Sequence, residues 1–281
     1  MEISSSNLSS QISLVDADEL KPHEEVVDSI VKTLANEMRS EGQVRDPLIV
    51  DRENYVILDG MHRFTSLKLL KCGSVPCCLV DYDSNHIKVG SWFRLFSVRA
   101  AGSLAEELLN ENRLDYSKQN IKLEDMSYNI HAIILTDNGT QFTLPNSLDP
   151  IEKANTAALL ERAMVSRGHA VEYLSEIVAI EHLKSRVVNF LIQVPIFSKK
   201  QIREFGLNQR LLPHKVTRHV IPSRPLRINV PLELLQDPSI SQVEANRKLG
   251  ELLAAKKIER KPPGSIVDGR RYEEELLVFS T

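Results

Sequence analysis

The stretch that decides the fold is Leu58–Phe64 (LDGMHRF), which follows the apolar run YVIL and leads into TSLKLLKCG. The run before it has the composition of a strand and the residues after it have helical spacing, so we expect a strand to pass into a helix here. A glycine at such a turn lets the backbone approach a ligand closely, and the free N–H groups of a helix start attract phosphate. Gly60, with the side chains of His62 and Arg63, therefore favours a nucleotide-phosphate site.

The same turn has a second interpretation, in which Asp59 caps the helix and the basic side chains are solvated at the surface. In the phosphate interpretation, Asp59 also holds a Mg²⁺ ion directly or through water. The loop GQVRDP precedes the predicted hairpin and can bring a further arginine to the same place. The residues of the predicted nucleotide site are Asp59, Gly60, Met61, His62, Arg63 and Arg45.

The residues around the turn predict a compact α+β domain over 13–86. ISLVDADEL is typical of a strand, and KPHEEVVDSIVKTLANEMRSEG predicts a helix entered at Pro22 and ended at Gly42. Leu48–Val50 and Tyr55–Leu58 predict a hairpin with a polar turn. The helix after LDGMHR is expected to end at KCG, and VPCCLVDYD predicts the last strand.

The rest of the chain has a different texture. Short predicted strands such as GSWFRLF, HAIILTD and QFTL alternate with segments of helical spacing such as IEKANTAALLERAMVSRG. No repeat or low-complexity linker divides this part, so we expect residues 87–281 to form one α/β lobe that binds the substrate, with an active-site cleft between the two lobes. The polar, Ser-rich residues 1–12 are expected to be disordered.

The composition excludes several classes of protein. A formal net charge of -3 over 281 residues supplies no overall positive field for nucleic acid or acidic membranes. The cysteines, Cys72, Cys77 and Cys78, are too few and too clustered for a disulfide framework, and they lack a second ligand pair for a metal. No secretory signal opens the chain, and no apolar run approaches the ~20 residues that cross a bilayer. We therefore expect a reducing, cytoplasmic setting.

The segment KPHEEV supplies a candidate catalytic acid, Glu24. An aliphatic hydroxyl is a poor nucleophile at neutral pH, so phosphoryl transfer to it needs a positioned base. The alternative is that Glu24 is an ordinary acid in the first turn of the predicted helix, where a carboxylate favours the helix dipole.

A second group of candidate residues lies in Lys215–Arg224 (KVTRHVIPSR), where basic side chains crowd around a proline. Such a segment can line an anion pocket, and the alternative is a solvated basic edge strand. Trp92 is the only tryptophan, and either a core position or a ligand platform suits it.

The order of LKPHE, GQVRDPLIVDRENYVILDGMHR and VPCCLVDYD resembles the ParB/sulfiredoxin-like fold, which carries a Gly-X-X-Arg phosphate-binding motif at this turn, here Gly60–Arg63. Within that superfamily the chain resembles the free L-serine kinases over about Val15 to Phe279. Their IDGVHRYTSLKALG stretch is mirrored by LDGMHRFTSLKLLKCG, their VTR segment by Val216–Arg218, and their C-terminus by RRYEEELLVF.

The resemblance implies a kinase that transfers the terminal phosphate of ATP or ADP to the hydroxyl of free L-serine, with Mg²⁺, and gives O-phospho-L-serine for cysteine or related amino-acid biosynthesis. Glu24 would activate the serine hydroxyl, and the Asp59–Arg63 turn would bind the nucleotide phosphates. The residues implied for substrate and product phosphate are Trp92, Thr217, Arg218, His219 and Arg224.

Other members of the superfamily fit less well. Sulfiredoxin uses a cysteine where Met61 stands, and methionine cannot form its sulfinyl–thiol intermediate. A DNA-binding ParB protein needs a helix-turn-helix and a basic groove, and we find neither in the sequence. A non-catalytic, ParB-like nucleotide-sensing or DNA-binding regulator stays as the alternative. The choice between ATP and ADP, the acceptance of threonine or homoserine, and homo-oligomer formation are left open.

Overall fold

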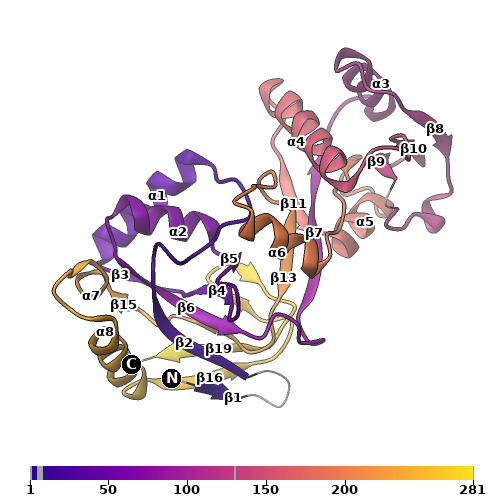
Figure 1. Cartoon of the computed structure of the whole chain (residues 1–281). Helices are drawn as coiled ribbons and strands as arrows, with labels where there is room; N and C mark the ends of the chain where they lie inside the picture. The colour runs from indigo at the N-terminus through magenta and orange to yellow at the C-terminus, as the bar shows by residue number, and fades with distance from the viewer. Residues whose placement is uncertain (1, 5–8, 130, 281) are drawn as a thin grey trace. The chain divides into compact units, whose positions relative to one another are not determined.

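The computed structural model describes residues 2–4, 9–129 and 131–280, and the chain divides into two compact units (Figure 1). The first unit runs up to Lys88 and takes in 199–211 and the chain from His219 onward; the second comprises Val89–Ser198 and Leu212–Arg218. The expected α+β, two-lobe fold class is confirmed. The boundary differs from the prediction, however, because residues from 219 onward, expected in the second lobe, belong to the first unit.

The first unit is built on a five-stranded sheet in the order β1-β2-β6-β4-β5. β6 is antiparallel to β2 and parallel to β4, and β4 and β5 form the predicted hairpin. The strands are β1 (Glu2–Ser4), β2 (Ser9–Asp16), β4 (Leu48–Asp51), β5 (Ile57–Asp59) and β6 (Ser74–Val80). Cys77 and Cys78 are neighbours on β6 and both are buried, so the sheet is covered on both faces.

The expectation of a disordered N-terminus is wrong for the residues that the structure describes. Glu2–Ser4 pairs with Ser9–Gln11, and β2 continues along β6. The backbone groups of these polar residues are therefore used by the sheet, which the Ser-rich composition did not indicate. Residues 1 and 5–8 of the expected disordered segment lie outside the described residues.

Two helices of the first unit, α1 (Asp28–Glu41) and α2 (Met61–Leu69), pack together. α1 ends as predicted at Gly42, which has φ 67°. Its start was predicted too early: the residues around Glu24 are extended, because Lys21 forms a parallel bridge with Val56 and exchanges backbone hydrogen bonds with the hairpin. Ladder hydrogen bonds thus replace the helical ones over this stretch.

The C-terminal part returns to the first unit through its own strands and helices. β15 pairs with β3, and β19 lies between β14 and β16. On α8, Asn246 binds both the N–H and the C=O of Leu14, which completes the hydrogen bonding of β2, and Leu249 and Leu277 join the core of the sheet. The elements are β3 (Gln43–Val44), α6 (Lys199–Leu207), β13 (Thr217–Val220), β14 (Arg224–Leu226), β15 (Val230–Pro231), α7 (Leu232–Gln236), α8 (Gln242–Ala254), β16 (Lys257–Lys261), β17 (Ile266–Val267), β18 (Arg270–Arg271) and β19 (Leu276–Ser280).

The second unit has a sheet in the order β11-β7-β12-β9-β10-β8, with β13 beside β7. Its strongest helix start is that of α4, where Asp149 and Glu152 form a capping box. The elements are β7 (Lys88–Phe96), α3 (Ala101–Glu111), β8 (Ser117–Asn120), η1 (Leu123–Asp125), β9 (Ala132–Thr136), β10 (Thr140–Thr143), α4 (Pro150–Ser166), β11 (Glu172–Ser175), α5 (Glu176–Lys184) and β12 (Phe190–Ile192). Among the described residues of both units, no helix combines the length and apolar character needed to cross a membrane.

Candidate active site

The turn at Gly60 is a tight strand-to-helix connection, as predicted. Gly60 has φ 104° and precedes α2 directly, and no side chain caps the helix start. A Cβ placed on Gly60 would lie 2.6 Å from Leu48 Cδ2 and 2.9 Å from Arg63 Nη2. Only glycine fits both the left-handed backbone and the space, so the N–H groups at the start of α2 can approach a ligand closely.

Arg63 lies one turn into α2 and folds back over Gly60. Its Nη2 donates to Asp59 Oδ2 at 3.2 Å, while its Nε is buried and has no hydrogen-bond partner among the described residues. A buried donor without a partner costs free energy, and an anionic oxygen is the natural acceptor for a guanidinium. Arg63 therefore has the hydrogen-bonding capacity to bind a phosphate at this turn.

Arg224 is held by the protein rather than offered to a ligand. Its Nε donates to Glu274 Oε1 at 2.7 Å, Nη1 to Asp59 Oδ2 at 2.8 Å and Nη2 to the carbonyl O of His219 at 3.0 Å. Burial lowers its pKa, but the carboxylates of Asp59 and Glu274 outweigh burial and leave the pKa raised, so the guanidinium stays charged. In this arrangement Arg224 orients Asp59, and its predicted contact with substrate stays a prediction; Glu274 was not found from the sequence.

The segment that carries Glu24 runs alongside the segment that carries the turn. Two contacts, each 35 positions apart in sequence, join them: Lys21 to Val56, and the N–H of Val27 to His62 Nε2 at 3.1 Å. Glu24 lies between these two contacts in the sequence, and it precedes α1 instead of lying in its first turn. Its role as the catalytic acid beside the phosphate turn stays a prediction.

His62 joins the starts of the two helices. Its Nε2 accepts from the N–H of Val27, so this nitrogen carries no proton in the arrangement seen, and the imidazole ties the start of α2 to the residue before α1. Its contact with phosphate stays a prediction. Met61, beside it, is buried in the core.

Two histidines of the first unit are buried and neutral. His23 Nδ1 lies 2.7 Å from the carbonyl O of Ile57, and burial lowers its pKa to about 4. Burial, together with the neighbouring His23, lowers the pKa of His219 to about 3. The Nε2 atom of His219 lies 2.8 Å from the hydroxyl of Tyr82. A neutral imidazole donates one hydrogen bond from its protonated nitrogen and accepts one at the other, and it adds no charge to the site.

Arg45 pairs with Glu41 at the end of α1. Its Nε donates to Glu41 Oε2 at 2.8 Å, its Nη2 also pairs with Glu41, and its side chain is 57 % exposed. Its place among the nucleotide ligands stays a prediction.

In the second unit, Trp92, Lys215 and Arg218 gather on one side of β7. Lys215 Nζ lies 4.9 Å and Arg218 Cζ 5.9 Å from the centre of the Trp92 ring. Arg218 also pairs with Glu176 at 3.5 Å, and a Cβ on Gly90 would lie 2.6 Å from Glu176 Oε1. Glu176 was not found from the sequence, since the only signal was an acid at a helix start.

Thr217, the remaining predicted substrate residue, is buried in β13 next to Arg218. The strand is held at its entry by Arg94, a fully buried arginine of β7. The guanidinium of Arg94 donates to the carbonyl O atoms of His214 at 2.8 Å and Lys215 at 3.0 Å. Arg94 thereby fixes the backbone that leads to the predicted substrate residues.

The described residues fit a protein-held metal poorly. They contain no group of three histidine, cysteine, aspartate or glutamate side chains that could hold an ion. Oδ2 of Asp59, the predicted ligand, accepts from both Arg63 and Arg224. Mg²⁺ in nucleotide sites is held largely by phosphates and water, so any such ion would depend on the nucleotide more than on this carboxylate.

The chain is similar to curated proteins and to solved structures. No protein-family model matches the chain. It is 27% identical over 231 residues to the ATP-dependent L-serine kinase of Staphylothermus marinus, covering 79% of this chain and 90% of that protein. It is 25% identical over 227 residues to the ADP-dependent L-serine kinase SerK of Thermococcus kodakarensis, covering 79% and 91%.

A solved structure shares the fold. It is a glutamate-to-alanine variant of a free serine kinase in complex with ADP, with a TM-score of 0.67 at 21% identity over 80% of this chain and 93% of that one. The expected resemblance to proteins named serine kinases is therefore confirmed over most of the chain.

Proposed function

We propose that this chain is a phosphotransferase that moves the terminal phosphate of ATP or ADP to the hydroxyl of free L-serine and yields O-phospho-L-serine. The observation that carries the proposal is the Gly60 turn, where a helix start and the unpartnered Nε of Arg63 follow a hairpin that is bonded to the segment preceding Glu24. The relatives named L-serine kinases, matched over nine tenths of their length, support the same acceptor.

The nucleotide phosphates bind at the start of α2. Backbone N–H groups and the helix dipole attract the anion, and Arg63 donates a hydrogen bond to it from Nε. Asp59 pairs with Arg63 and is itself held by Arg224, so the Arg63 donors are positioned before the nucleotide binds. Phosphoryl transfer relies mainly on such positioning and on stabilising charge.

Glu24 takes the proton from the serine hydroxyl as the oxygen attacks the terminal phosphorus. The bond from that phosphorus to the leaving phosphate oxygen breaks, and the nucleotide departs with one phosphate fewer. The extended backbone beside the hairpin fixes Glu24 more firmly than a frayed helix start would. Trp92, Thr217 and Arg218 are proposed to bind the acceptor, since an arginine pairs well with a carboxylate or phosphate.

Mg²⁺ would supply charge neutralisation on the phosphates, as in other phosphoryl transfers. It stays a prediction, and an activity assay with and without a chelator tests it. The choice between ATP and ADP stays open too, because relatives named for each donor match the chain. Use of the product in cysteine or related amino-acid biosynthesis, and cytoplasmic localisation, are also retained as predictions.

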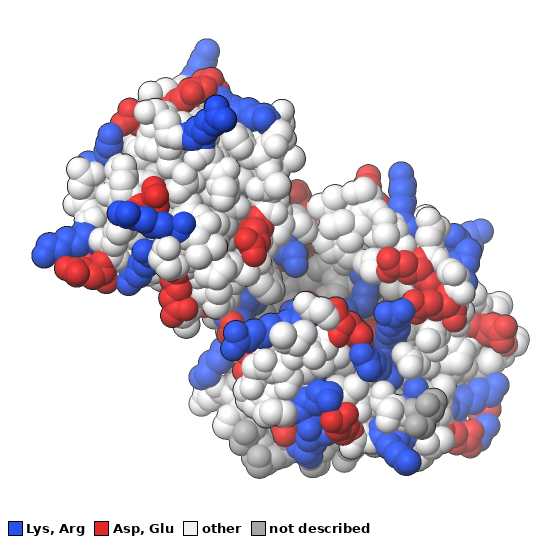
Figure 2. All heavy atoms as spheres, turned by 180° about the vertical axis from the view of Figure 1, so that it is seen from behind, with Lys and Arg blue, Asp and Glu red and all other residues white. Residues whose placement is uncertain are grey.

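Nucleic acid is not among the proposed partners. On the face in Figure 2, Lys and Arg side chains are interspersed with Asp and Glu. Many surface charges among the described residues are paired, as Arg247 is with Glu244 and Glu251, and Arg167 with Glu107. Paired charges attract a phosphate backbone weakly.

The test is a matrix of donors and acceptors: ATP or ADP with L-serine, L-threonine or L-homoserine, with the phosphorylated amino acid as readout. We expect phosphoserine from at least one donor. Threonine is expected to be a weaker acceptor, because one methyl group is discriminated by only ~1–3 kcal/mol. No phosphorylated amino acid in any combination, with or without Mg²⁺, would refute the proposal.

The first variant to measure is Glu24→Gln. It keeps the shape of the side chain and removes the base, so kcat should fall by roughly 100-fold or more while nucleotide binding survives. The matched control is Glu25→Gln, because Glu25 is the exposed neighbour. Equal turnover in the parent and the Glu24 variant would remove Glu24 from the mechanism.

The second variant is Arg63→Ala, which removes the buried donor. A hydrogen bond to a charged group contributes about 1.5–3 kcal/mol, so the nucleotide Kd should rise roughly 10- to 100-fold. Lys68→Ala on the exposed side of α2 is the control. Calorimetric titration with ADP gives both constants, and an unchanged Kd in the Arg63 variant would contradict the assignment.

A further inference from the structure

Tyr82 and His219 form a buried pair in the first unit. Tyr82 follows β6 and is fully buried, and its hydroxyl lies 2.8 Å from His219 Nε2. His219 is 5% exposed, and its Nδ1 is buried without a hydrogen-bond partner among the described residues. Nε2 of the imidazole is therefore occupied by Tyr82, whereas Nδ1 is available to a ligand.

The direction of the Tyr82–His219 hydrogen bond follows from acidity. Burial raises the pKa of the Tyr82 phenol and lowers that of His219 to about 3, so both groups are neutral at physiological pH. A neutral imidazole has one donor and one acceptor nitrogen, and a phenol is a stronger acid than a neutral imidazole N–H. This difference favours donation from the hydroxyl to Nε2, an arrangement that places the proton of His219 on Nδ1.

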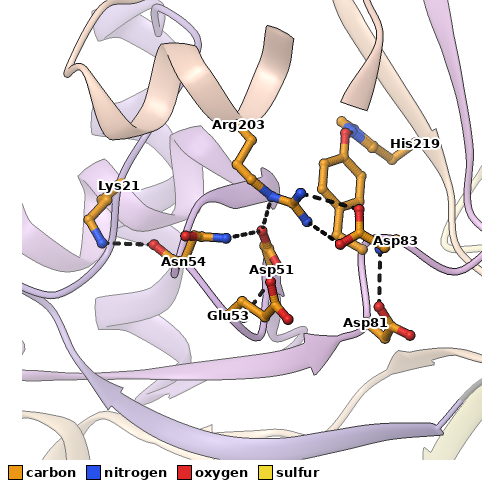
Figure 3. A network of polar contacts seen from close by, with 9 residues as sticks. Lys21, Asp51, Glu53, Asn54, Asp81, Asp83, Arg203 and His219 are labelled. Carbon is orange, nitrogen blue, oxygen red and sulfur yellow. Dashed lines mark hydrogen bonds and ion pairs between the residues drawn. The ribbon is translucent and has the colours of Figure 1, made fainter. Parts of the chain in front are cut away.

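The Tyr82 ring is held from α6. Arg203 Cζ and Lys199 Nζ lie 5.4 Å and 5.5 Å from the ring centre. Figure 3 shows how Arg203 is itself anchored: its Nε donates to the buried Asp51 at 2.8 Å, and its two other nitrogens donate to Asp83 at 3.2 Å. With both its ring and its hydroxyl fixed, Tyr82 can impose one tautomer and one orientation on His219.

His219 belongs to the same network as the phosphate turn. Its carbonyl O accepts from Arg224, whose Nη1 donates to Asp59 at 2.8 Å. Asp59 in turn binds Arg63 at 3.2 Å. The two residues with a buried nitrogen that lacks a partner among the described residues, His219 at Nδ1 and Arg63 at Nε, are thus joined in one network through Arg224 and Asp59. A ligand oxygen would relieve the cost of leaving such donors unpaired.

We propose that Tyr82 is a positioning residue that holds His219 as the neutral tautomer protonated on Nδ1, so that this N–H donates to an oxygen of the bound phosphoryl group. The donation to phosphate rests on the proposed function, whereas the tautomer does not. A neutral donor at this place binds a phosphate oxygen without adding to the positive charge of the arginines. The hydrogen bond between Nε2 and Tyr82 keeps the imidazole ring from rotating out of alignment.

The tautomer is measured on the full chain labelled with ¹⁵N-histidine, by long-range ¹H–¹⁵N correlation, with the His219 signal assigned from a His219→Asn variant. We expect the Nδ1-protonated form in the parent and a mixture of tautomers in Tyr82→Phe. Titration with ADP, and separately with O-phospho-L-serine, should shift the Nδ1 signal of the parent. An Nε2-protonated parent, an unchanged tautomer in Tyr82→Phe, or an Nδ1 signal unmoved by both probes would overturn the proposal.

Kinetics separate positioning from structural support. Tyr82→Phe should lower kcat roughly 10-fold, with the KM for serine changed less than about 3-fold. Tyr128→Phe, which removes another partly buried phenol hydrogen bond, should leave kcat unchanged. Equal losses in kcat for the two variants would indicate a structural effect only and overturn the proposal. If the parent makes no phosphoserine, the proposed function fails, while the tautomer and the ADP titration still decide the role of Tyr82.

Discussion

At the scale of single residues, Gly60 shows how one side chain, or its absence, sets the chemistry. Its φ of 104° and its close approach to Leu48 leave no room for a Cβ. The same geometry starts α2 directly after β5, and the first N–H groups of a helix can bind phosphate. The phosphate turn and the packing of the hairpin therefore both depend on glycine at position 60. A substitution there should lower both the stability of the fold and the affinity for nucleotide.

Gly60→Ala should lower the free energy of unfolding by about 1–3 kcal/mol through strain, and should also weaken binding of ADP. Gly42→Ala is the matched control, since Gly42 has φ 67° but open space around it and therefore carries only the backbone cost. Urea unfolding and an ADP titration on both variants test this. Equal effects of the two substitutions on ADP binding would show that the close approach at Gly60 does not matter.

The residues of the site differ in how far the sequence could predict them. Gly60 and Arg63 are three positions apart, and their arrangement follows from local turn geometry. Glu176 and Tyr82 were missed because their partners are distant: Arg218 is 42 positions from Glu176, and His219 is 137 positions from Tyr82. The contact of Arg224 with Asp59 spans 165 positions, so its orienting role was not predicted from the sequence.

At the scale of elements, β7 and β13 are coupled through Arg94. Its guanidinium, fully buried, joins Glu161 at 2.7 Å and the carbonyl O of Trp92 at 2.7 Å to the backbone of 214–215. The fork geometry of arginine matters here, because Arg94 donates to four acceptors and an ammonium group has only three N–H donors. The orientation of Trp92 and Arg218 thus depends on Arg94, which acts through the backbone of both segments.

Arg94→Lys should therefore act at a distance. It keeps the charge but loses the fork, so we expect a destabilisation of about 3 kcal/mol and a KM for serine raised several-fold, with the KM for nucleotide little changed. Arg167→Lys, at a more exposed ion pair of the same unit, is the control. Steady-state kinetics with each substrate varied in turn test the separation; a change confined to the nucleotide KM would contradict it.

Elements with local signals were predicted well, and those set by tertiary contacts were not. The hairpin, α2 and the α4 helix follow from alternation, turn residues and caps. The start of α1 was wrong, because the backbone around Lys21 bonds to the hairpin instead of to itself. The segment AVEYLSEIVAIEHLKSR has helical spacing throughout, but Glu172–Ser175 pairs with β7 as β11 and only the part that follows forms α5.

At the scale of the whole molecule, the return of the C-terminal strands to the first unit closes the site network. Arg224 and Glu274 come from this returning part, whereas Asp59 belongs to the N-terminal domain. The network also buries two neutral histidines, His23 and His219, whose ring centroids are 6.1 Å apart. Folding of the first unit therefore carries a proton linkage.

The sign of this linkage is set by the lowered pKa values. In the unfolded chain a histidine has a pKa near 6.5 and binds a proton as the pH falls below it, whereas the folded pKa values are about 4 for His23 and about 3 for His219. Between these limits the unfolded state holds more protons, so stability falls with falling pH. By pH 5 each histidine should cost about 2 kcal/mol relative to pH 7.

Urea unfolding at pH 7 and pH 5 should accordingly show a loss of several kcal/mol, at a pH where most carboxylates are still ionised. His23→Asn removes one of the two linked groups, so its loss between the two pH values should be about half that of the parent, whatever its stability at pH 7. His86→Asn, at an exposed histidine, should leave the parent difference unchanged. If the parent is equally stable at both pH values, these histidines are not buried as neutral groups, and the neutral His219 donor loses its basis.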